Sequence, residues 1–178
     1  LDEGNAHAIF LSPEVVVYGD LAEIVESTLE YPVTLTPCTL DQLPQDNLRP
    51  TEMEALKSGL IQSGFVAVGN DSRDFLSWWK TRVDIDPLNG QEVSQIRIQR
   101  WLDLVPGMWS TNLLTDPSYN IGYWNLPQRK LSLEGDDVLV DGKPIKFMNF
   151  KGFDPQSPWV LSPEMGDASR FWPRESQA

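Results

Sequence analysis

A short polar break follows the first apolar run of the chain and places a carboxylate where ligands often bind. Residues 8–11 are apolar and are followed directly by Ser12, Pro13 and Glu14. In α/β proteins, ligands bind in crevices at the carboxyl ends of strands. A carboxylate at such a place can hold a divalent cation that neutralises a diphosphate. A single carboxylate is weak support for a metal site. Glu14 is therefore a candidate metal ligand, and the case for it depends on what the rest of the sequence indicates.

A second candidate is an aromatic segment with amide side chains on both sides. In residues 119–126, which read YNIGYWNL, Asn120 and Asn125 flank the aromatic Trp124. An aromatic ring can stack on the apolar face of a sugar, and amides can hydrogen-bond its hydroxyl groups. Trp124 is therefore either a sugar platform or a core residue, and both interpretations stay open. Three other tryptophans lie on helical stripes and are expected in the core: Trp78, Trp79 and Trp101.

The rare residue types limit the chemistry. His7 is the sole histidine, which excludes a histidine-rich metal site, and we expect it at the surface. Cys38 is the sole cysteine, cannot form an internal disulfide and is interpreted as a small apolar residue. The chain begins with Leu1 and has no recognisable signal peptide, so we expect a cytoplasmic location and a chain cut from a longer protein.

The net charge excludes several partners. The 178 residues carry a net charge of −12, and residues 1–89 hold 15 of the 26 acidic side chains. This charge argues against nucleic acid and against an anionic membrane surface, because both require clustered Lys and Arg. No apolar stretch is long enough for a transmembrane segment. The acidic half is most simply a solvated surface, although a metal site or a docking surface for a basic partner is an alternative. Lys151 and the pair Arg129-Lys130 are candidate phosphate contacts, but isolated basic residues are usually solvated.

The order of the expected elements favours an α/β fold. Apolar and β-branched runs predict strands at 8–11, 15–18, 33–35 and 65–68. Helical periodicity predicts helices at 20–31, 51–59, 71–83 and 91–105. Asp20 is the expected N-cap of the first helix, Thr51 and Glu54 form a capping-box pattern, and Pro106-Gly107 is expected to end the last helix.

The last third of the chain has a different pattern. Short β-type pieces at 131–133, 138–140 and 145–150 are separated by turns. The dipeptide Asp141-Gly142 is typical of a two-residue hairpin. We therefore predict a C-terminal hairpin region within a domain that covers residues 1–165, followed by a tail at 166–178.

Six blocks of sequence resemble, in the same order, a family of bacterial nucleotide-sugar glycosyltransferases related to the glycogenin and lipopolysaccharide galactosyltransferase group. The family patterns include an Asp-x-Asp strand end, "sG.yN.GF.av", "fL.WW" and "DQ.W.DLVP". The matching blocks are AIFLSPEVVVYGDLAEIVESTLEYPVTLTPCTL (8–40), SGLIQSGFVAV (58–68), FLSWW (75–79), QRWLDLVP (99–106), YNIGYWNL (119–126) and FKGFDP (150–155). Together they extend over about residues 8–165.

The resemblance implies a nucleotide-diphospho-sugar transferase fold, with a mixed sheet that binds a sugar nucleotide through Mn²⁺ or Mg²⁺. By position in the family patterns, it implies Gln62 and Gln99 as catalytic residues. It also implies contacts to donor or acceptor from Ser12, Gly64, Asn120, Trp124, Asn125 and Gly152. The implied partners are a nucleotide-sugar and a glycan or lipid-linked acceptor.

The chain departs from the family at the residues that would hold the metal. Ser12 and Glu14 stand where the family has two aspartates, and Asn149 stands where it has a histidine. Hard cations prefer charged oxygen ligands, and imidazole adds a strong site, so Glu14 and Asn149 form only a weakened metal site. Ile98 also replaces the Asp of the "DQ" pair, and Gln62 replaces an Asn.

The family also has a first βαβ unit upstream of the acidic motif, where the base and ribose bind. Only seven residues precede Ala8, so the resemblance implies a partial domain that lacks this unit, with further domains possible in a longer chain. Two functions follow as alternatives. The first is sugar transfer, and the second is a non-catalytic carbohydrate-binding or scaffold role in a protein of glycan assembly.

Overall fold

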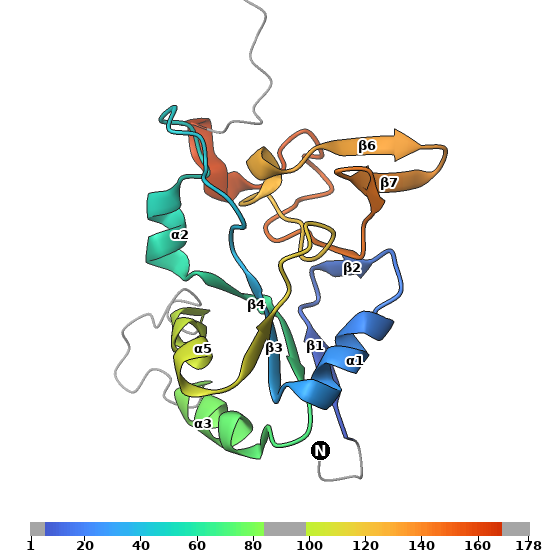
Figure 1. The fold of residues 1–178 in the computed structure, drawn as a ribbon. Coiled ribbons are helices and arrows are strands. Elements are labelled where there is room, and N and C mark those ends of the chain that lie inside the picture. Colours follow the sequence, from blue (N-terminus) through green and yellow to red (C-terminus); the bar gives the residue numbers. More distant parts are fainter. Residues whose placement is uncertain (1–5, 84–98, 169–178) are drawn as a thin grey trace, which may run out of the picture.

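The computed structural model describes residues 6–83 and 99–168, which form a mixed α/β structure with helices on both sides of a central sheet (Figure 1). The elements of the first part are β1 (Ala8–Leu11), β2 (Val15–Val17), α1 (Ala22–Glu30), β3 (Val33–Pro37), α2 (Glu52–Ser58), β4 (Ile61–Val68) and α3 (Arg73–Val83). The second part contains η1 (Leu102–Leu104), α5 (Val105–Met108), β5 (Thr111–Leu113), η2 (Leu126–Gln128), β6 (Leu131–Glu134), β7 (Asp137–Val140), β8 (Lys143–Pro144), β9 (Phe147–Asn149) and η3 (Pro163–Ala168).

The central sheet has four strands in the order β1-β4-β3-β5. β4 runs antiparallel to both β1 and β3, whereas β5 runs parallel to β3. This confirms the expected mixed sheet with flanking helices. The structure adds β5, a strand of only three residues that lies outside the expected strands.

The alternation of side chains along β4 explains why both faces of the sheet are covered. Phe65 and Ala67 face a cluster that contains Ile24 of α1 and Phe147 of β9. Val66 and Val68 face the opposite cluster, where Phe75 of α3 packs with residues of η1 and α5. Successive side chains of a strand point to opposite faces, so the part of β4 that is covered on both faces, residues 65–68, is apolar.

Helix α2 begins as the sequence predicts. The Thr51 hydroxyl accepts a hydrogen bond from the Glu54 backbone N–H, and the Glu54 carboxylate accepts one from the Thr51 backbone N–H. The helix ends at Gly59, whose φ of 121° favours glycine. At α1 the cap position is Leu21, so the N-cap assignment of Asp20 is wrong by one residue, although Asp20 still accepts a hydrogen bond from the Ala22 N–H.

The expected helix end at Pro106-Gly107 is wrong. The 3₁₀ turn η1 continues directly into α5, and Pro106 lies in the first turn of α5. Proline is tolerated there because the first backbone N–H groups of a helix have no partner within the helix. The expected beginning of this helix, at 91–98, lies outside the described residues.

The predicted aromatic stripe of α3 is confirmed in part. Phe75 is fully buried, and Trp78 and Trp79 pack against the same cluster. Trp101, which was expected in the core, is 38% exposed, and Val83 at the end of α3 is also exposed. The Arg82 guanidinium lies 5.1 Å from the centre of the Trp101 ring in a cation–π contact, and the Trp78 ring centre lies 6.4 Å away, so Trp101 packs at the exposed edge of the cluster.

The hairpin region follows the predicted turns. β6 and β7 pair antiparallel, and β7 pairs with β8 across Asp141-Gly142. Asp141 and Gly142 have φ values of 51° and 80°, as a two-residue hairpin turn with both φ positive requires. β9 leaves this region and pairs antiparallel with β2, which joins the hairpin region to the beginning of the chain.

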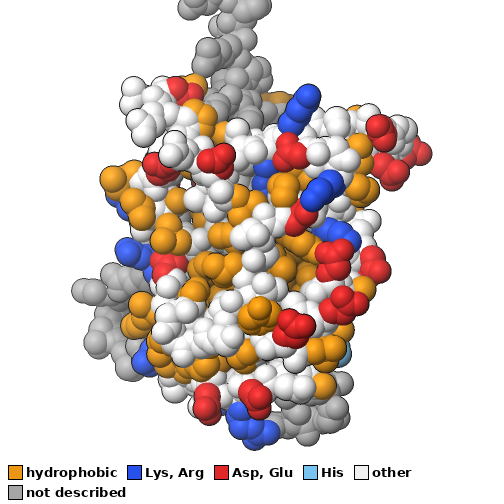
Figure 2. Space-filling model, viewed as in Figure 1, with side chains coloured by type: hydrophobic (Ala, Val, Ile, Leu, Met, Phe, Trp, Pro, Cys, Tyr) orange, Lys and Arg blue, Asp and Glu red, His pale blue; other side chains and the backbone are white. Residues whose placement is uncertain are grey.

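The negative charge lies largely on solvated surface. Acidic side chains gather over α1 and at the tip of the β6–β7 hairpin (Figure 2). They include Glu23, Glu26, Glu30, Glu134, Asp136 and Asp137, all exposed. Among the described helices, none has the length and apolar character that crossing a membrane requires.

Candidate functional site

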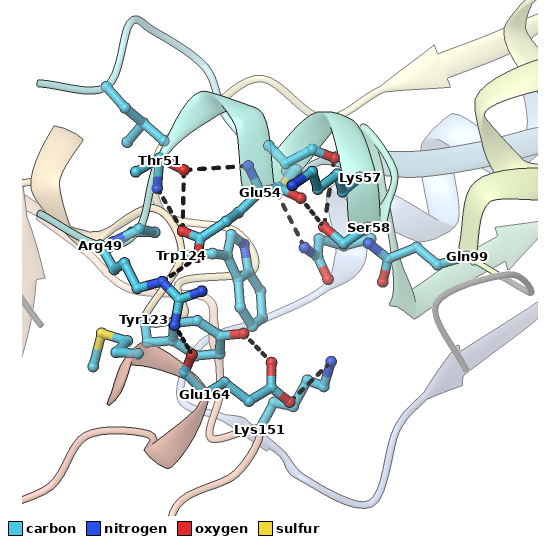
Figure 3. Close-up of a pocket in the computed structure, with 16 residues that line it drawn as sticks. Arg49, Thr51, Glu54, Lys57, Ser58, Gln99, Tyr123, Trp124, Lys151 and Glu164 are labelled. Carbon is cyan, nitrogen blue, oxygen red and sulfur yellow. Dashed lines mark hydrogen bonds and ion pairs between the residues drawn. The ribbon is translucent and has the colours of Figure 1, made fainter. Parts of the chain in front are cut away.

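Two cavities adjoin in the structure and share four lining residues. The strand cavity, of about 840 Å³, is lined mainly by β1, β4 and α3 together with Ser12, Glu14 and Asn149. The helix cavity, of about 560 Å³, lies beside α2 and is lined by Tyr123, Trp124 and Glu164 among others (Figure 3). The residues that line both are Ser58, Gln62, Gln99 and Lys151, called here the junction residues.

Strand pairing brings the residues at the expected metal positions together. Val15 of β2 lies opposite Asn149 of β9, and the Phe150 N–H donates to the Glu14 carbonyl at 2.9 Å. Ser12 lies at the end of β1, where its N–H donates to the Gly64 carbonyl at 2.9 Å. Ser12, Glu14 and Asn149 therefore line one side of the strand cavity, although 135 positions separate Glu14 from Asn149 (149 − 14).

An irregularity in β4 makes room for this arrangement. Leu35 of β3 lies opposite Val66, but Thr36 lies opposite Gln62, so residues 63–65 have no partner on β3. Gly64 lies within this bulge, and a Cβ at that position would come within 2.4 Å of Asn149 Nδ2. Bulges commonly redirect side chains near functional sites. Here the bulge and Gly64 let Asn149 pack against β4.

The donor set does not fit a tightly bound divalent metal. The Ser12 hydroxyl donates to Glu14 Oε2 at 2.9 Å, and the Asn149 Oδ1 accepts from the Lys151 backbone N–H at 3.0 Å. Among the described residues, Glu14 is the one carboxylate that lines the strand cavity. The described residues also contain no cluster of three potential metal ligands. A hard cation requires several charged or carbonyl oxygen ligands that converge on one point.

The two predicted catalytic residues, Gln62 and Gln99, are both buried junction residues. Gln62 Nε2 donates to the Cys38 sulfur at 3.3 Å, and Gln99 Nε2 donates to the Gly59 carbonyl at 3.4 Å. Gln99 Oε1 also accepts from the Ser63 hydroxyl at 3.4 Å. Burial raises the pKa of the Cys38 thiol, so Cys38 is a neutral packing residue of the helix cavity.

Ion pairs between distant segments hold the walls of the helix cavity. Arg49 pairs with Glu54 of α2, and Lys151 Nζ lies 3.4 Å from Glu164 Oε1. The Tyr123 hydroxyl donates to the other oxygen of Glu164. Figure 3 shows these side chains converging from α2 on one side and from η3 and the loops on the other. Burial and the neighbouring Glu164 carboxylate raise the pKa of Tyr123, which keeps its hydroxyl a donor.

Trp124 forms one wall of the helix cavity and is also a packing residue. It is 6% exposed, contacts Cys38 and Ala55, and its ring centre lies 5.2 Å from that of Tyr123. Its buried Nε1 has no hydrogen-bond partner within the described residues. The structure therefore supports the core interpretation of Trp124 and also leaves its N–H available for a bound ligand.

The other predicted binding residues lie apart from both cavities. Asn125 Oδ1 accepts from the Gly122 N–H, and its Nδ2 donates to the Asn120 carbonyl, so its amide stabilises a turn. Asn120 Nδ2 donates to the Thr36 hydroxyl at 2.7 Å. Gly152 has a φ of 75°, and a Cβ there would lie 2.7 Å from Ser162 Oγ. Direct ligand contact from Asn120, Asn125 and Gly152 stays a prediction.

Several cavity residues were missed at the level of sequence. Arg49, Lys57 and Glu164 line the helix cavity but belong to no recognisable motif, and Tyr123 lies in the YNIGYWNL segment without being singled out there. Lys151 was a candidate phosphate contact, and the structure places it at the junction. Arg129, the other such candidate, donates to the carbonyls of Pro117 and Tyr119, and burial lowers its pKa to about 10.

The fold and the cavities define a mixed α/β protein with two adjoining cavities. No model of a known protein family matches the sequence. The chain is 28% identical over 148 residues to an uncharacterized protein of Bacillus subtilis (strain 168), YfnF. This match includes 81% of the chain and 48% of YfnF, so the chain spans about half the length of the curated relative.

Proposed function

We propose that the protein transfers a sugar from a nucleotide-sugar donor to a glycan or lipid-linked acceptor. The observation that carries the proposal is the meeting of two cavities at Gln62 and Gln99, the residues at the implied catalytic positions. A transferase must bring two substrates together at one reacting carbon, and two adjoining cavities provide such a meeting point. The nucleotide-diphospho-sugar transferase type of the fold is part of this proposal.

The two substrates are assigned by the chemistry of the walls. The strand cavity takes the donor's sugar and diphosphate, because Ser12, Gly64 and Asn149 line it at a strand end. The helix cavity takes the acceptor, because Tyr123 and Trp124 offer an aromatic wall with hydrogen-bond donors. Under this proposal the base and ribose are held by another part of the longer protein.

The reaction needs little covalent participation from these residues. The acceptor oxygen forms a bond to the anomeric carbon while the bond from that carbon to the diphosphate breaks, and the hydroxyl proton leaves to water or with the diphosphate. The buried amides of Gln62 and Gln99 orient sugar hydroxyl groups at the junction. Such positioning supplies much of the rate enhancement when two substrates must be aligned.

The test is an activity screen with the full-length protein. Nucleotide sugars with different bases and sugars are incubated with a panel of glycan acceptors, and release of the nucleoside diphosphate is measured. Gln62→Leu is expected to lower the rate about a hundredfold, the scale typical of a lost positioning donor. Gln156→Leu, a matched change at an exposed position, is expected to leave the rate unchanged. Absence of release from every donor would overturn the proposal.

A non-catalytic carbohydrate-binding role is the second candidate, because Ser12, Glu14 and Asn149 form a weaker metal site than the residues of the family do. A glycan array probed with the same protein separates the two: glycan binding without turnover of any donor supports the binding role. We also propose a cytoplasmic location, which rests on the single Cys38, since one cysteine cannot form an internal disulfide.

A further inference from the structure

We propose that Asn149 and Lys151 bind the donor's diphosphate directly and that no divalent metal ion is needed. This inference rests on the proposed function and specifies how its donor cavity works. It begins from the mismatch between the implied metal site and the residues present. Glu14 is the one carboxylate among the described residues that line the strand cavity, and Lys151 is the one basic residue there.

The orientation of the Asn149 amide favours an anion. Its Oδ1 accepts a hydrogen bond from the Lys151 backbone N–H at 3.0 Å, and only an oxygen can accept that bond. Its Nδ2 must therefore point away from Lys151 N, and it makes no hydrogen bond within the described part of the chain. Asn149 is 4% exposed and lines the strand cavity. An N–H donor without a hydrogen-bond partner, on a residue that lines the cavity, suits a phosphate oxygen, whereas a metal requires a lone pair.

Lys151 supplies the positive charge that a metal ion would otherwise supply. Its side chain reaches the junction of the two cavities, where the diphosphate of a donor in the strand cavity would meet the acceptor. Its present partner is the Glu164 carboxylate, with Nζ and Oε1 3.4 Å apart. The ammonium therefore already holds a carboxylate, on the helix-cavity side of the junction. The diphosphate would compete with Glu164 for this contact.

The experiment is calorimetric titration of the full-length protein with UDP, GDP, CDP, ADP and dTDP, first in excess EDTA and then with excess manganese chloride. We expect the preferred diphosphate to bind in EDTA with an affinity that manganese does not change. Lys151→Met is expected to weaken binding in EDTA about ten- to hundredfold, the loss typical of a hydrogen bond to a charged group. Lys143→Met, which removes a lysine of a different ion pair on β8, is the matched control and leaves the affinity unchanged.

Two further variants separate anion binding from metal binding and from a structural role. Asn149→Asp keeps the acceptor for the Lys151 N–H but replaces the free N–H₂ by a carboxylate, so it weakens binding in EDTA, whereas a metal site would bind more tightly. Glu164→Gln removes the competing carboxylate and is expected to strengthen binding about two- to fivefold. A purely structural Lys151–Glu164 pair would change thermal stability in both variants and leave the affinity unchanged.

The outcomes distinguish this inference from the proposed function. Binding that requires manganese, or that Asn149→Asp strengthens, overturns metal-free recognition and leaves sugar transfer standing. Binding in EDTA that Lys151→Met does not affect also overturns the inference alone. If no nucleoside diphosphate binds with or without manganese, the inference and the proposed function fail together. The response of the unaltered protein to manganese decides the question even where a variant does not fold.

Discussion

The two cavities are built in different ways. In the strand cavity, Ser12, Gly64 and Asn149 are held by the backbone pairing of β1 with β4 and of β2 with β9. In the helix cavity, the walls are held by side-chain contacts between distant segments, such as Arg49 with Glu54 and Tyr123 with Glu164. The polar groups of the first cavity therefore depend on strand register, and those of the second depend on individual side chains.

This difference suits the proposed substrates. A diphosphate is common to all donors and needs donors at fixed positions, which strand register provides. Acceptors differ from protein to protein, and a wall made of separate side chains can change without disturbing the sheet. The comparison predicts that substitutions in the two cavities have separable effects on stability and on binding.

The largest effect is expected at the aromatic wall of the helix cavity. Trp124→Ala removes a ring that packs on Cys38 and Ala55, and we expect the free energy of unfolding to fall by about 3–5 kcal/mol. Trp159→Ala, at a side chain 64% exposed, is the matched control and should change it by less than about 0.5 kcal/mol. Denaturant unfolding measures the free energy of unfolding of both variants. Equal losses in Trp124→Ala and Trp159→Ala would show that Trp124 does not stabilise the wall.

The next largest effect tests whether the polar groups of the strand cavity depend on the pairing of the strands that line it. Gly64→Ala places a Cβ within 2.4 Å of Asn149 Nδ2 and should cost about 1–3 kcal/mol of the free energy of unfolding through overpacking. Diphosphate affinity should fall in the same variant because Asn149 is displaced. Gly107→Ala in α5 meets no atom within 4 Å and serves as the control for both measurements. Unaltered diphosphate affinity in Gly64→Ala would contradict the role given to Asn149.

A smaller loss of stability is expected at the start of α2, the helix that lies beside the helix cavity. Thr51→Ala removes the capping box at the start of the helix that bears Glu54 and Lys57, and should cost about 1 kcal/mol. Ser77→Ala, at an exposed position within α3, should change stability by only a few tenths of a kcal/mol. Thermal unfolding compares the two. If Thr51→Ala also weakens diphosphate binding strongly, the two cavities are not separable as described.

The smallest effect on stability is expected at Asp116, which lies outside both cavities. Its ion pair with Lys143 shows how much a solvated pair contributes to the free energy of unfolding. Burial opposes ionisation of Asp116, but hydrogen bonds from Lys143 and Ser118 outweigh it and lower the pKa of Asp116 to about 2. A lowered pKa stabilises the folded state above the unfolded value of about 4, and this stability is lost as the pH falls toward 2. The pair is solvated, so the contribution is less than about 1 kcal/mol.

Unfolding measured between pH 5 and pH 2 should therefore show slightly less pH dependence in Asp116→Asn than in the unaltered protein. Diphosphate affinity at neutral pH should be the same in both proteins, because Asp116 lines neither cavity. A strong loss of affinity in Asp116→Asn would contradict the separation of the hairpin region from the site.

The sequence predicts the strand cavity better than the helix cavity, and the reason is physical. The strand end at Ser12 and Glu14 is a short-range pattern that local chemistry determines, as are, outside the strand cavity, the capping box of Thr51 and the turn at Asp141-Gly142. Asn149 was found by resemblance, and strand pairing then places it beside the acidic turn.

The helix cavity depends on contacts that no local pattern contains. Tyr123 and Glu164 are 41 positions apart, and the Arg49 side chain donates to the Glu164 carbonyl across 115 positions. The wrong prediction for Trp101 has a similar cause. Helical periodicity marks a stripe, but tertiary packing decides which stripe is buried, and here Arg82 covers Trp101 at the surface.

The most direct test of the account is a crystal structure of the full-length protein, grown in EDTA, with the nucleoside diphosphate that binds best. The account predicts the diphosphate at the junction of the two cavities, with phosphate oxygens within hydrogen-bond distance of Asn149 Nδ2 and Lys151 Nζ. In the same structure, Glu164 should have moved away from Lys151. A diphosphate bound elsewhere, or one that occupies the site only with a metal ion held by Glu14, would contradict it.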